Sequence, residues 1–511
     1  MSKLSIIIPT QDEEQTISSV IEEAKKLSPL EIIVVINGSS DNTKQIVQSH
    51  QCKIIEYPFS IGNDVGRAIG ALHANGDILL FIDGDIPIPS NKLFPFVREI
   101  QSGSDIALNN LRWTAQLPIR PHTTTVSKIA VNHFLRASSL SVNSLIAIPH
   151  AMSKVALEKI GWHHLADPVL AQAIAIEKKL KIASPIDVDV IGTNRIRPVH
   201  SAPSVGSPYP QSTSRILGDH LRAIQYLIEK KGPRGGFTDG NRNRKLLQRF
   251  VPHSFAKRAK RSAVIPVGEE KRTISQVISS VRQAGVDEII VVANGADRDT
   301  LHFAQQEKVL LVPFGKQLGH NVGRAIGAAY ATGEICLFID GDFVIPPDDL
   351  IPFIQAVEGG VDIALNNLEF LMDQFHPMDT ISVVKYFLNL SAGRPDLLNN
   401  SLTAVPHAMH RRVIDKIGFK SLMIPPKAQV EALQQGFKIQ ATHVVDVVKP
   451  NRIRQDHVST QGKIPAFERI IGDHVEALGH LLHLTNHRGL FTDGNRKREL
   501  LKMEDKENDN I

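Results

Sequence analysis

The sequence predicts an α/β protein built from two tandem copies of one domain, each with a mostly parallel sheet flanked by helices. The chain has 511 residues, the length of two ordinary domains. Apolar runs typical of buried strands alternate with stretches of helical periodicity, as in βαβ units. Residues 76–85, an apolar run that ends in Asp83-Gly84-Asp85, return as residues 333–342.

The repeat covers almost the whole chain and decides the domain organisation. Asp340 follows Asp83 by 257 positions (340 − 83), and Asp473 follows Asp219 by 254 (473 − 219). Each copy is long enough to bury a core and fold by itself. The predicted boundaries are residues 1–245 for the first domain, 246–260 for a basic linker, 261–502 for the second domain and 503–511 for a disordered polar tail.

Apolar patterning predicts the elements of the first copy in chain order. Strands are expected at 4–8, 31–36 and 53–57, and a fourth strand leads into Asp83. Helices are expected between them. The helical segments before Asp83 are 16–26 and 63–74; after Asp85 come helices at 93–100, 125–138, 156–160, 169–180 and 216–231, and extended segments at 106–109 and 186–191.

Two carboxylates stand at the end of the central strand in each copy. Gly84 lets the backbone turn sharply where the strand stops, between Asp83 and Asp85. Ligands of open α/β sheets bind at this edge. Paired carboxylates suit Mg²⁺ or Mn²⁺ held together with a diphosphate, so Asp85 and its counterpart Asp342 are candidate metal ligands.

Composition excludes several classes of protein. The hydrophobic fraction of 42% and charged fraction of 22% describe a globular protein, and no apolar run reaches the roughly 18 residues of a membrane span. A strand is expected within the first eight residues, so no secretory signal is expected there. Cys52 and Cys336 occupy different repeat positions and predict neither a disulfide framework nor a zinc site. A cytoplasmic protein is expected, and a net charge of +5 without a basic stripe does not indicate nucleic-acid binding.

Four ordered motifs at strand ends and helix starts, each present twice, resemble the family-2 glycosyltransferases of the GT-A fold. The resemblance covers most of both copies. In the first copy the motifs are Pro9-Thr10-Gln11-Asp12-Glu13-Glu14, Asn37-Gly38-Ser39-Ser40-Asp41, Gly66-Arg67-Ala68-Ile69-Gly70 and Asp83-Gly84-Asp85. In the second they are Pro266-Val267-Gly268-Glu269-Glu270, Asn294-Gly295, Gly323-Arg324-Ala325-Ile326-Gly327 and Asp340-Gly341-Asp342.

The resemblance implies a metal-dependent transfer of a sugar from a nucleotide-diphosphate sugar, such as a UDP- or GDP-sugar, to an acceptor hydroxyl, with two donor sites per chain. Asp83 would face the ribose, and Asp85 and Asp342 would hold Mn²⁺ or Mg²⁺ and serve catalysis. The remaining donor-binding residues would be Pro9, Thr10, Glu13, Asn37, Gly38, Gly66, Arg67 and Gly84 in the first copy, and Pro266, Glu270, Asn294, Gly295, Gly323, Arg324, Asp340 and Gly341 in the second.

Inverting members of this family carry a general base on a later helix. Asp167 is the nearest candidate, and Ile424 stands at its position in the second copy. Either the second site lacks this base or neither site uses one, and retaining GT-A enzymes need none. The stereochemical outcome therefore stays open.

Several recurring residues are further candidates. His200 and His457 would complete the metal shell, as a late histidine does in several GT-A enzymes. His150 and His407 would position a ligand or support the structure. The segment 238–242, Thr-Asp-Gly-Asn-Arg, recurs as 492–496 and would close over the donor or cap a helix.

Two other functions are compatible with a GT-A fold. A sugar-phosphate nucleotidyltransferase needs a glycine-rich basic loop after the first strand, whereas residues 9–14 are acidic and contain no glycine. A non-catalytic nucleotide-sugar sensor or scaffold is disfavoured by the two Asp-Gly-Asp turns, although Ile424 keeps it open for the second copy.

Overall fold

The computed structural model describes residues 2–192, 201–252, 259–449 and 464–502. His200 and His457, the two candidate metal-binding histidines, lie outside these residues. Contacts divide the chain into two compact units. Unit 1 comprises Met1–Leu227 together with Thr485–Ile511, and unit 2 comprises Ile228–Leu484.

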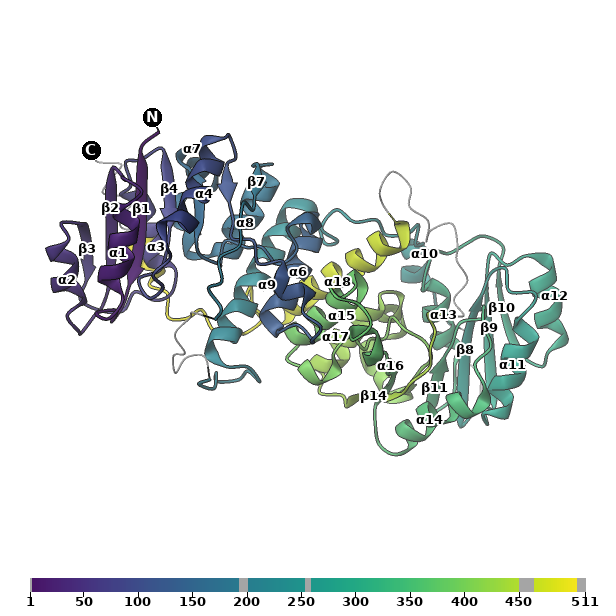
Figure 1. Ribbon diagram of the computed structural model, residues 1–511. Coiled ribbons are helices and arrows are strands. Elements are labelled where there is room, and N and C mark those ends of the chain that lie inside the picture. Colours follow the sequence, from purple (N-terminus) through teal and green to yellow (C-terminus); the bar gives the residue numbers. More distant parts are fainter. Residues whose placement is uncertain (1, 193–200, 253–258, 450–463, 503–511) are drawn as a thin grey trace. The chain divides into compact units, whose positions relative to one another are not determined.

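The sheet of unit 1 has seven strands in the order β3-β2-β1-β4-β6-β5-β7 (Figure 1). Strand β6 runs antiparallel to both of its neighbours, β4 and β5, and the other pairs are parallel. The strands are β1 (Leu4–Thr10), β2 (Glu31–Asn37), β3 (Lys53–Tyr57), β4 (Ile78–Phe81), β5 (Ile106–Ala107), β6 (His150–Ser153) and β7 (Ile182–Ala183).

Unit 2 repeats this topology in the order β10-β9-β8-β11-β13-β12-β14, with β13 antiparallel (Figure 1). The prediction of two α/β domains with mostly parallel sheets is confirmed. The strands are β8 (Arg261–Val267), β9 (Glu288–Asn294), β10 (Leu310–Phe314), β11 (Ile335–Phe338), β12 (Ile363–Asn366), β13 (His407–His410) and β14 (Ile439–His443).

Helices separate the strands in both units. In the first repeat they are α1 (Ile17–Lys25), α2 (Thr43–Ser49), α3 (Val65–Leu72), α4 (Ser90–Gln101), α5 (Trp113–Gln116), α6 (Thr123–Phe134), α7 (Lys154–Ile160), α8 (Pro168–Glu177) and α9 (Gln211–Lys231). The others are α10 (Arg244–Arg249), α11 (Ile274–Gln283), α12 (Arg298–Gln306), α13 (Val322–Tyr330), α14 (Pro347–Glu358), α15 (Thr380–Ser391), α16 (Arg411–Ile417), α17 (Pro425–Gln434) and α18 (Pro465–Leu484). In the part of the chain that is described, no helix combines the length and apolar character needed to cross a membrane.

Strand β1 explains why both faces of the sheet are covered. Successive side chains of a strand point to opposite faces. Ile7 packs in one buried cluster with Ile69 of α3, whereas Ile6 and Ile8 pack in another cluster with Ile21 of α1. The continuous apolar run of β1 is therefore buried on both sides, as expected for a parallel strand between helical layers.

The extended segment predicted at 186–191 is not a strand. The Asn109 side chain replaces the backbone hydrogen bonds that a neighbouring strand would make there. The Asn109 amide donates to the carbonyl of Val188 at 2.9 Å, and the Val188 N–H donates to Oδ1 of Asn109 at 2.9 Å. The regular pairing instead occurs earlier, where Ile182 pairs with Ile106. A side-chain amide thus satisfies backbone groups that the pattern assigned to a strand.

Equivalent segments at the ends of the two repeats contribute to different units. Leu500 and Leu501 pack in the core of unit 1, whereas Leu247 and Phe250 pack in the core of unit 2. Contacts therefore divide the chain differently from the predicted boundaries at 245 and 261. Part of the predicted linker forms helix α10, in which Leu247 is buried.

Candidate functional site

The Asp83-Gly84-Asp85 turn is fixed against the end of β1. The Gly84 N–H donates to the Pro9 carbonyl at 3.3 Å, and the Thr16 hydroxyl donates to the Gly84 carbonyl at 2.8 Å. A Cβ at position 84 would lie 2.7 Å from Thr10 Oγ1, so any larger residue would force Thr10 to shift. The turn holds both carboxylates at the carboxyl end of the sheet, where the sequence placed them.

Arg67, in the first turn of α3, orients the first of these carboxylates. Its Nη2 lies 3.0 and 3.2 Å from the two oxygens of Asp83, and its Nη1 lies 3.1 Å from Asp64. Burial opposes the charge of the guanidinium, but Asp83 and Asp64 together raise the pKa of Arg67 above its ordinary value. Arg67 therefore stays a cation and fixes the position of Asp83.

A cavity of about 540 Å³ opens beside this turn in unit 1. This volume is in the range of small-molecule sites, about 300–1,000 Å³. The cavity brings together residues from all four motifs. Of the donor-binding residues predicted for the first copy, Gly38 does not line it. The predicted donor and metal residues that line it are Pro9, Thr10, Glu13, Asn37, Gly66, Arg67, Asp83, Gly84 and Asp85.

Asn37 serves the backbone as well as the cavity. Its Oδ1 accepts a hydrogen bond from the Ile61 N–H at 2.5 Å, and its amide donates to the Gly62 carbonyl at 3.3 Å. Gly38 follows with φ +65°, and a Cβ there would lie 2.5 Å from the Phe59 carbonyl carbon. The Asn-Gly pair therefore holds the 59–62 loop in place.

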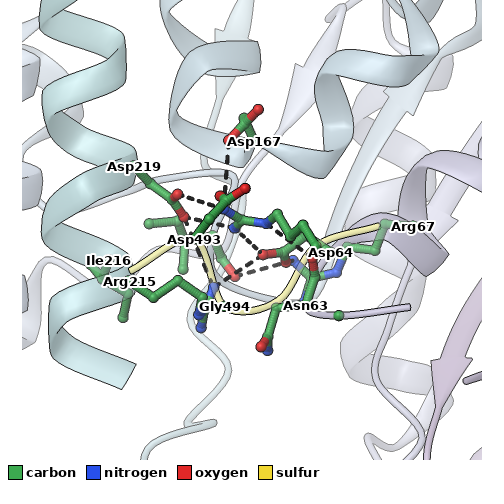
Figure 2. A network of polar contacts seen from close by, with 12 residues as sticks. Asn63, Asp64, Arg67, Asp167, Arg215, Ile216, Asp219, Asp493 and Gly494 are labelled. Carbon is green, nitrogen blue, oxygen red and sulfur yellow. Dashed lines mark hydrogen bonds and ion pairs between the residues drawn. The ribbon is translucent and has the colours of Figure 1, made fainter. Parts of the chain in front are cut away.

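The last segment of the second repeat forms one wall of the same cavity. Leu490, Thr492, Gly494 and Asn495 line it. Arg496 anchors this wall, because its guanidinium donates to both oxygens of Asp219 at 2.7 and 2.8 Å and to Asp64 at 2.9 Å. Figure 2 labels both of these acids and Gly494 of the wall. The sequence offered one signal for this wall, the recurring Thr-Asp-Gly-Asn-Arg segment, but no indication of which unit it serves.

Asp64 and Asp219 are the acids that accept the hydrogen bonds of Arg496. Burial raises the pKa of Asp64, but Arg67, Arg215 and Arg496 outweigh it and lower the pKa below its usual value. The pKa of Asp219 is also lowered below its usual value, against burial, chiefly by Arg496 and Arg488. Both carboxylates are therefore charged anchors for the wall of the cavity.

Asp167, the predicted general base, lies outside the cavity lining. Its carboxylate is buried and accepts hydrogen bonds from Nη1 and Nη2 of Arg498, the latter at 2.8 Å, and Nε of Arg222 lies 3.3 Å away. Two guanidinium groups therefore contact this carboxylate. These contacts support an ion-pair role for Asp167, and the general-base role stays a prediction.

Asp167, Asp219 and Asp493 lie close enough together to resemble a cation site, with oxygens within 4.8 Å of one another. Arginines already supply the positive charge there, since Arg496 and Arg498 donate to these three carboxylates. The three acids are labelled in Figure 2. This cluster is an ion-pair network and does not extend the candidate metal residues.

Unit 2 repeats the turn with changed neighbours. Arg324 Nη2 lies 3.1 Å from Asp340, and Asn294 again bonds to backbone at Leu318 and Gly319. Val267 replaces Thr10, and its Cγ1 lies 2.8 Å from where a Cβ of Gly341 would be. The other predicted residues of this unit lie on the elements equivalent to those of unit 1. These are Pro266 in β8, Glu270 after it, Gly295 after β9, Gly323 in α13 and Asp342 after β11.

His150 and His407 are buried at matching positions. Nδ1 of each ring is within hydrogen-bond distance of a carbonyl, Ala147 at 2.9 Å and Ala404 at 2.8 Å, and each ring stacks on a phenylalanine of the sheet. Burial, together with a nearby arginine, lowers the pKa of each to about 3. Both histidines are therefore neutral, and these contacts support the structural alternative.

Comparison with known proteins decides the family. The profile described as glycosyl transferase family 2 matches residues 5–159 and again residues 262–409. The chain belongs to glycosyl transferase family 2. The two matches fall one in each repeat, so the two α/β units are tandem GT-A domains of this family.

Curated relatives of family 2 match over short regions. The dolichol-phosphate mannosyltransferase of Pyrococcus furiosus is 28% identical over 115 residues, which is 21% of this chain and 33% of that protein. The bactoprenol glucosyl transferase of Shigella phage SfV is 30% identical over 116 residues, which is 21% of this chain and 38% of that protein. The match thus spans about a third of the length of these relatives.

Solved structures are more distant in sequence. Glucosyl-3-phosphoglycerate synthase from Mycobacterium tuberculosis in complex with UDP is 17% identical, and the alignment covers 43% of this chain and 80% of that chain with a TM-score of 0.34. The same enzyme in complex with Mn²⁺, UDP and glucosyl-3-phosphoglycerate gives the same identity, coverage and TM-score.

Proposed function

We propose that unit 1 transfers a sugar from a nucleotide-diphosphate sugar to an acceptor hydroxyl. The observation that carries this proposal is the cavity of about 540 Å³, in which residues from all four family motifs meet beside the Asp83-Gly84-Asp85 turn. Its lining is mostly polar and includes Arg67 and Arg215, which suit a diphosphate. The family match supports the same reaction class.

The donor set of this turn fits a divalent cation. Asp83 is held by Arg67, and Asp85 lines the cavity two residues later, so a pair of carboxylates faces a site with room for a diphosphate. Carboxylate oxygens are the ligands that Mg²⁺ and Mn²⁺ prefer. Asp85 would hold the ion, which when bound offsets the charge that develops on the departing nucleoside diphosphate.

The chain's own residues would bind and orient the donor. Arg67 would keep Asp83 directed toward the ribose. Pro9, Thr10 and Glu13 would form the wall of the nucleotide site next to β1. Backbone N–H groups at the start of α3, at Gly66, are available for phosphate. Because Asp167 is engaged by arginines, no residue is assigned as general base, and either stereochemical outcome is compatible with the site.

Unit 2 would provide a second donor site around Asp340, Gly341 and Asp342. The Arg324–Asp340 pair at 3.1 Å repeats the Arg67–Asp83 pair, which supports the proposal. Val267 in place of Thr10 and Asn321 in place of Asp64 make the two sites chemically different. The nucleobase of the donor, as in UDP or GDP, remains a prediction. The acceptor hydroxyl and a cytoplasmic location also remain predictions.

Calorimetric titration tests this function. UDP and GDP are titrated into the full chain with Mn²⁺ and again with a chelator, and we expect binding at least about tenfold weaker without the ion. Asp85→Ala and Asp342→Ala should each remove one binding event. Asp348→Ala, an exposed acid outside the cavity, is the control. Equal affinity with and without Mn²⁺ would remove the metal from the mechanism, and no binding of either nucleotide would refute the donor site.

A further inference from the structure

Leu490 combines three unusual properties. It lines the cavity of unit 1, its side chain is 66% exposed, and its backbone has φ +67°, in the left-handed region. A branched apolar residue is disfavoured in this conformation. Because so much of the side chain is exposed, packing within the protein does not explain why leucine occupies this position.

The first repeat shows the unstrained alternative. Gly236 stands at the position equivalent to Leu490, 254 residues earlier (490 − 236), and has φ +77°. Glycine adopts this conformation without steric cost. The same turn therefore forms readily without a side chain, and the leucine is present only in the segment that serves unit 1.

A second difference between the two repeats stabilises the turn that carries Leu490. The Asn486 side chain accepts hydrogen bonds from the Arg488 N–H at 2.9 Å and from the Leu490 N–H at 3.0 Å. The equivalent residue of the first repeat is Gly232, which has no side chain to give this support. Arg488 then ties the turn to Asp219 at 2.8 Å. The turn that presents Leu490 is thus held in place by contacts on both sides.

The cavity otherwise offers little apolar surface. Apart from glycines, the lining residues are polar or charged except for Pro9, Val205 and Leu490. Nucleobases and sugar rings both carry an apolar face, and burying one side of it against an aliphatic side chain is favourable. A leucine fixed at the edge of a polar cavity matches this need.

We propose that Leu490 contacts the bound nucleotide sugar and gives the donor site of unit 1 a specificity that unit 2 lacks. The inference rests on the proposed donor site. Leu490 packs against an apolar face of the nucleotide sugar, on a wall supplied by the last segment of the second repeat. In unit 2, Gly236 leaves this surface absent.

Leu490→Gly separates this role from a structural one. The glycine suits φ +67°, so we expect the melting temperature to stay close to that of the parent chain. The parent is the Asp342→Ala chain, in which unit 1 carries the remaining binding. UDP, GDP and their glucose conjugates are titrated with Mn²⁺, and we expect the dissociation constant of the best ligand to rise about three- to tenfold.

Two matched controls complete the test. Leu30→Gly removes a leucine that is 52% exposed and outside the cavity lining, and should leave affinity unchanged. Leu490→Gly in an Asp85→Ala chain should not change binding at unit 2. Unchanged affinity for Leu490→Gly in the Asp342→Ala chain, or an equal loss in both parent chains, would overturn the inference alone. Absence of binding to the unsubstituted chain would overturn the proposed donor site and this inference with it.

Discussion

Arg498 donates hydrogen bonds to both carboxylate oxygens of Asp167, although 331 positions separate the two residues in the chain. The equivalent arginine of the first repeat, Arg244, binds a different acid: its Nη1 and Nη2 donate to Glu476 at 2.9 and 2.7 Å. Glu476 stands where unit 1 has Arg222. The acid that receives this arginine has therefore moved from the start of α8 to helix α18.

This relationship explains why Ile424 replaces Asp167 in the second repeat. In unit 2, Arg244 contacts Glu476 as well as Asp239. In unit 1, Arg498 contacts Asp493, and because the cation Arg222 stands at the position of Glu476, Asp167 supplies the second acid. The difference between the copies is thus an exchange of ion-pair partners. It gives no indication that unit 2 has lost a general base.

Asp167→Ile should destabilise unit 1. The substitution leaves Arg222 and Arg498 without their shared acid, and removing one partner of a buried ion pair is costly. Both arginines are partly exposed, 30% and 28%, so water can recover some of the loss. We expect about 2–3 kcal/mol less free energy of unfolding, measured by urea denaturation.

The double variant Asp167→Ile/Arg222→Glu recreates the arrangement of unit 2. It should recover most of the lost stability, because the carboxylate introduced at position 222 would face Arg498 as Glu476 faces Arg244. Sugar transfer, where measured, should recover in parallel. If stability returned and transfer did not, Asp167 would be needed for the chemistry, and the general-base interpretation would be restored.

Separated halves of the chain should need each other to fold. Fragment 1–250 lacks Arg488, Arg496 and Arg498, which bind the acids of unit 1, and lacks Leu501 from its core. We expect this fragment to melt without a cooperative transition when alone. Addition of fragment 251–511 should restore cooperative melting, followed by circular dichroism. Fragment 1–250 melting cooperatively as a monomer at the temperature of the full chain would show that residues 485–502 are dispensable for the fold.

The sequence predicted most of the architecture because its signals are local. Apolar runs bounded by turn residues identified strands such as Glu31–Asn37, and helical periodicity identified α1 and α3 within one or two residues. The repeat then transferred these assignments to the second copy. The site residues of the four motifs could be grouped for the same reason, since each motif ends a strand or begins a helix at one sheet edge.

The rest depends on contacts distant in sequence. The role of Asp167 depends on Arg498, and the wall of the cavity depends on a segment that follows another domain. Local pattern cannot show which copy of a recurring segment packs on which unit, because both copies carry the same Thr-Asp-Gly-Asn-Arg residues. Asn109, which replaces a ladder at Val188, is equally invisible to periodicity.

Gly62→Ala should displace residues 485–502, the last segment of the second repeat, from unit 1. Gly62 has φ +86°, and a Cβ there would lie 2.6 Å from the Asn495 carbonyl oxygen and 2.7 Å from the Arg496 Cα, which are backbone atoms that cannot rotate away. Gly103→Ala is the matched control, since Gly103 has φ +96° with nothing within 4 Å of the added Cβ. We expect Gly62→Ala to cost at least about 1–2 kcal/mol more than the control in thermal denaturation. Equal losses would mean that conformation alone, and not the segment, sets the cost.

Acidification between pH 6 and 4.5 should lower stability through buried neutral histidines. Burial lowers the pKa of His150 and His407 to about 3 and of His220 and His474 to about 4, whereas an unfolded histidine binds a proton near pH 6.5. The unfolded chain therefore binds more protons in this window, and the free energy of unfolding falls as pH falls. Each histidine contributes about 1.4 kcal/mol per pH unit, measured by urea denaturation at several pH values. The pKa of Asp219 is lowered, so its contribution to stability is lost only below its unfolded pKa near 3.8, which lies outside this window.

His150→Gln tests this argument. It should reduce the slope of the free energy of unfolding against pH by about 1.4 kcal/mol per pH unit, which corresponds to one proton. A slope unchanged by that substitution would show that His150 is not buried in the neutral form.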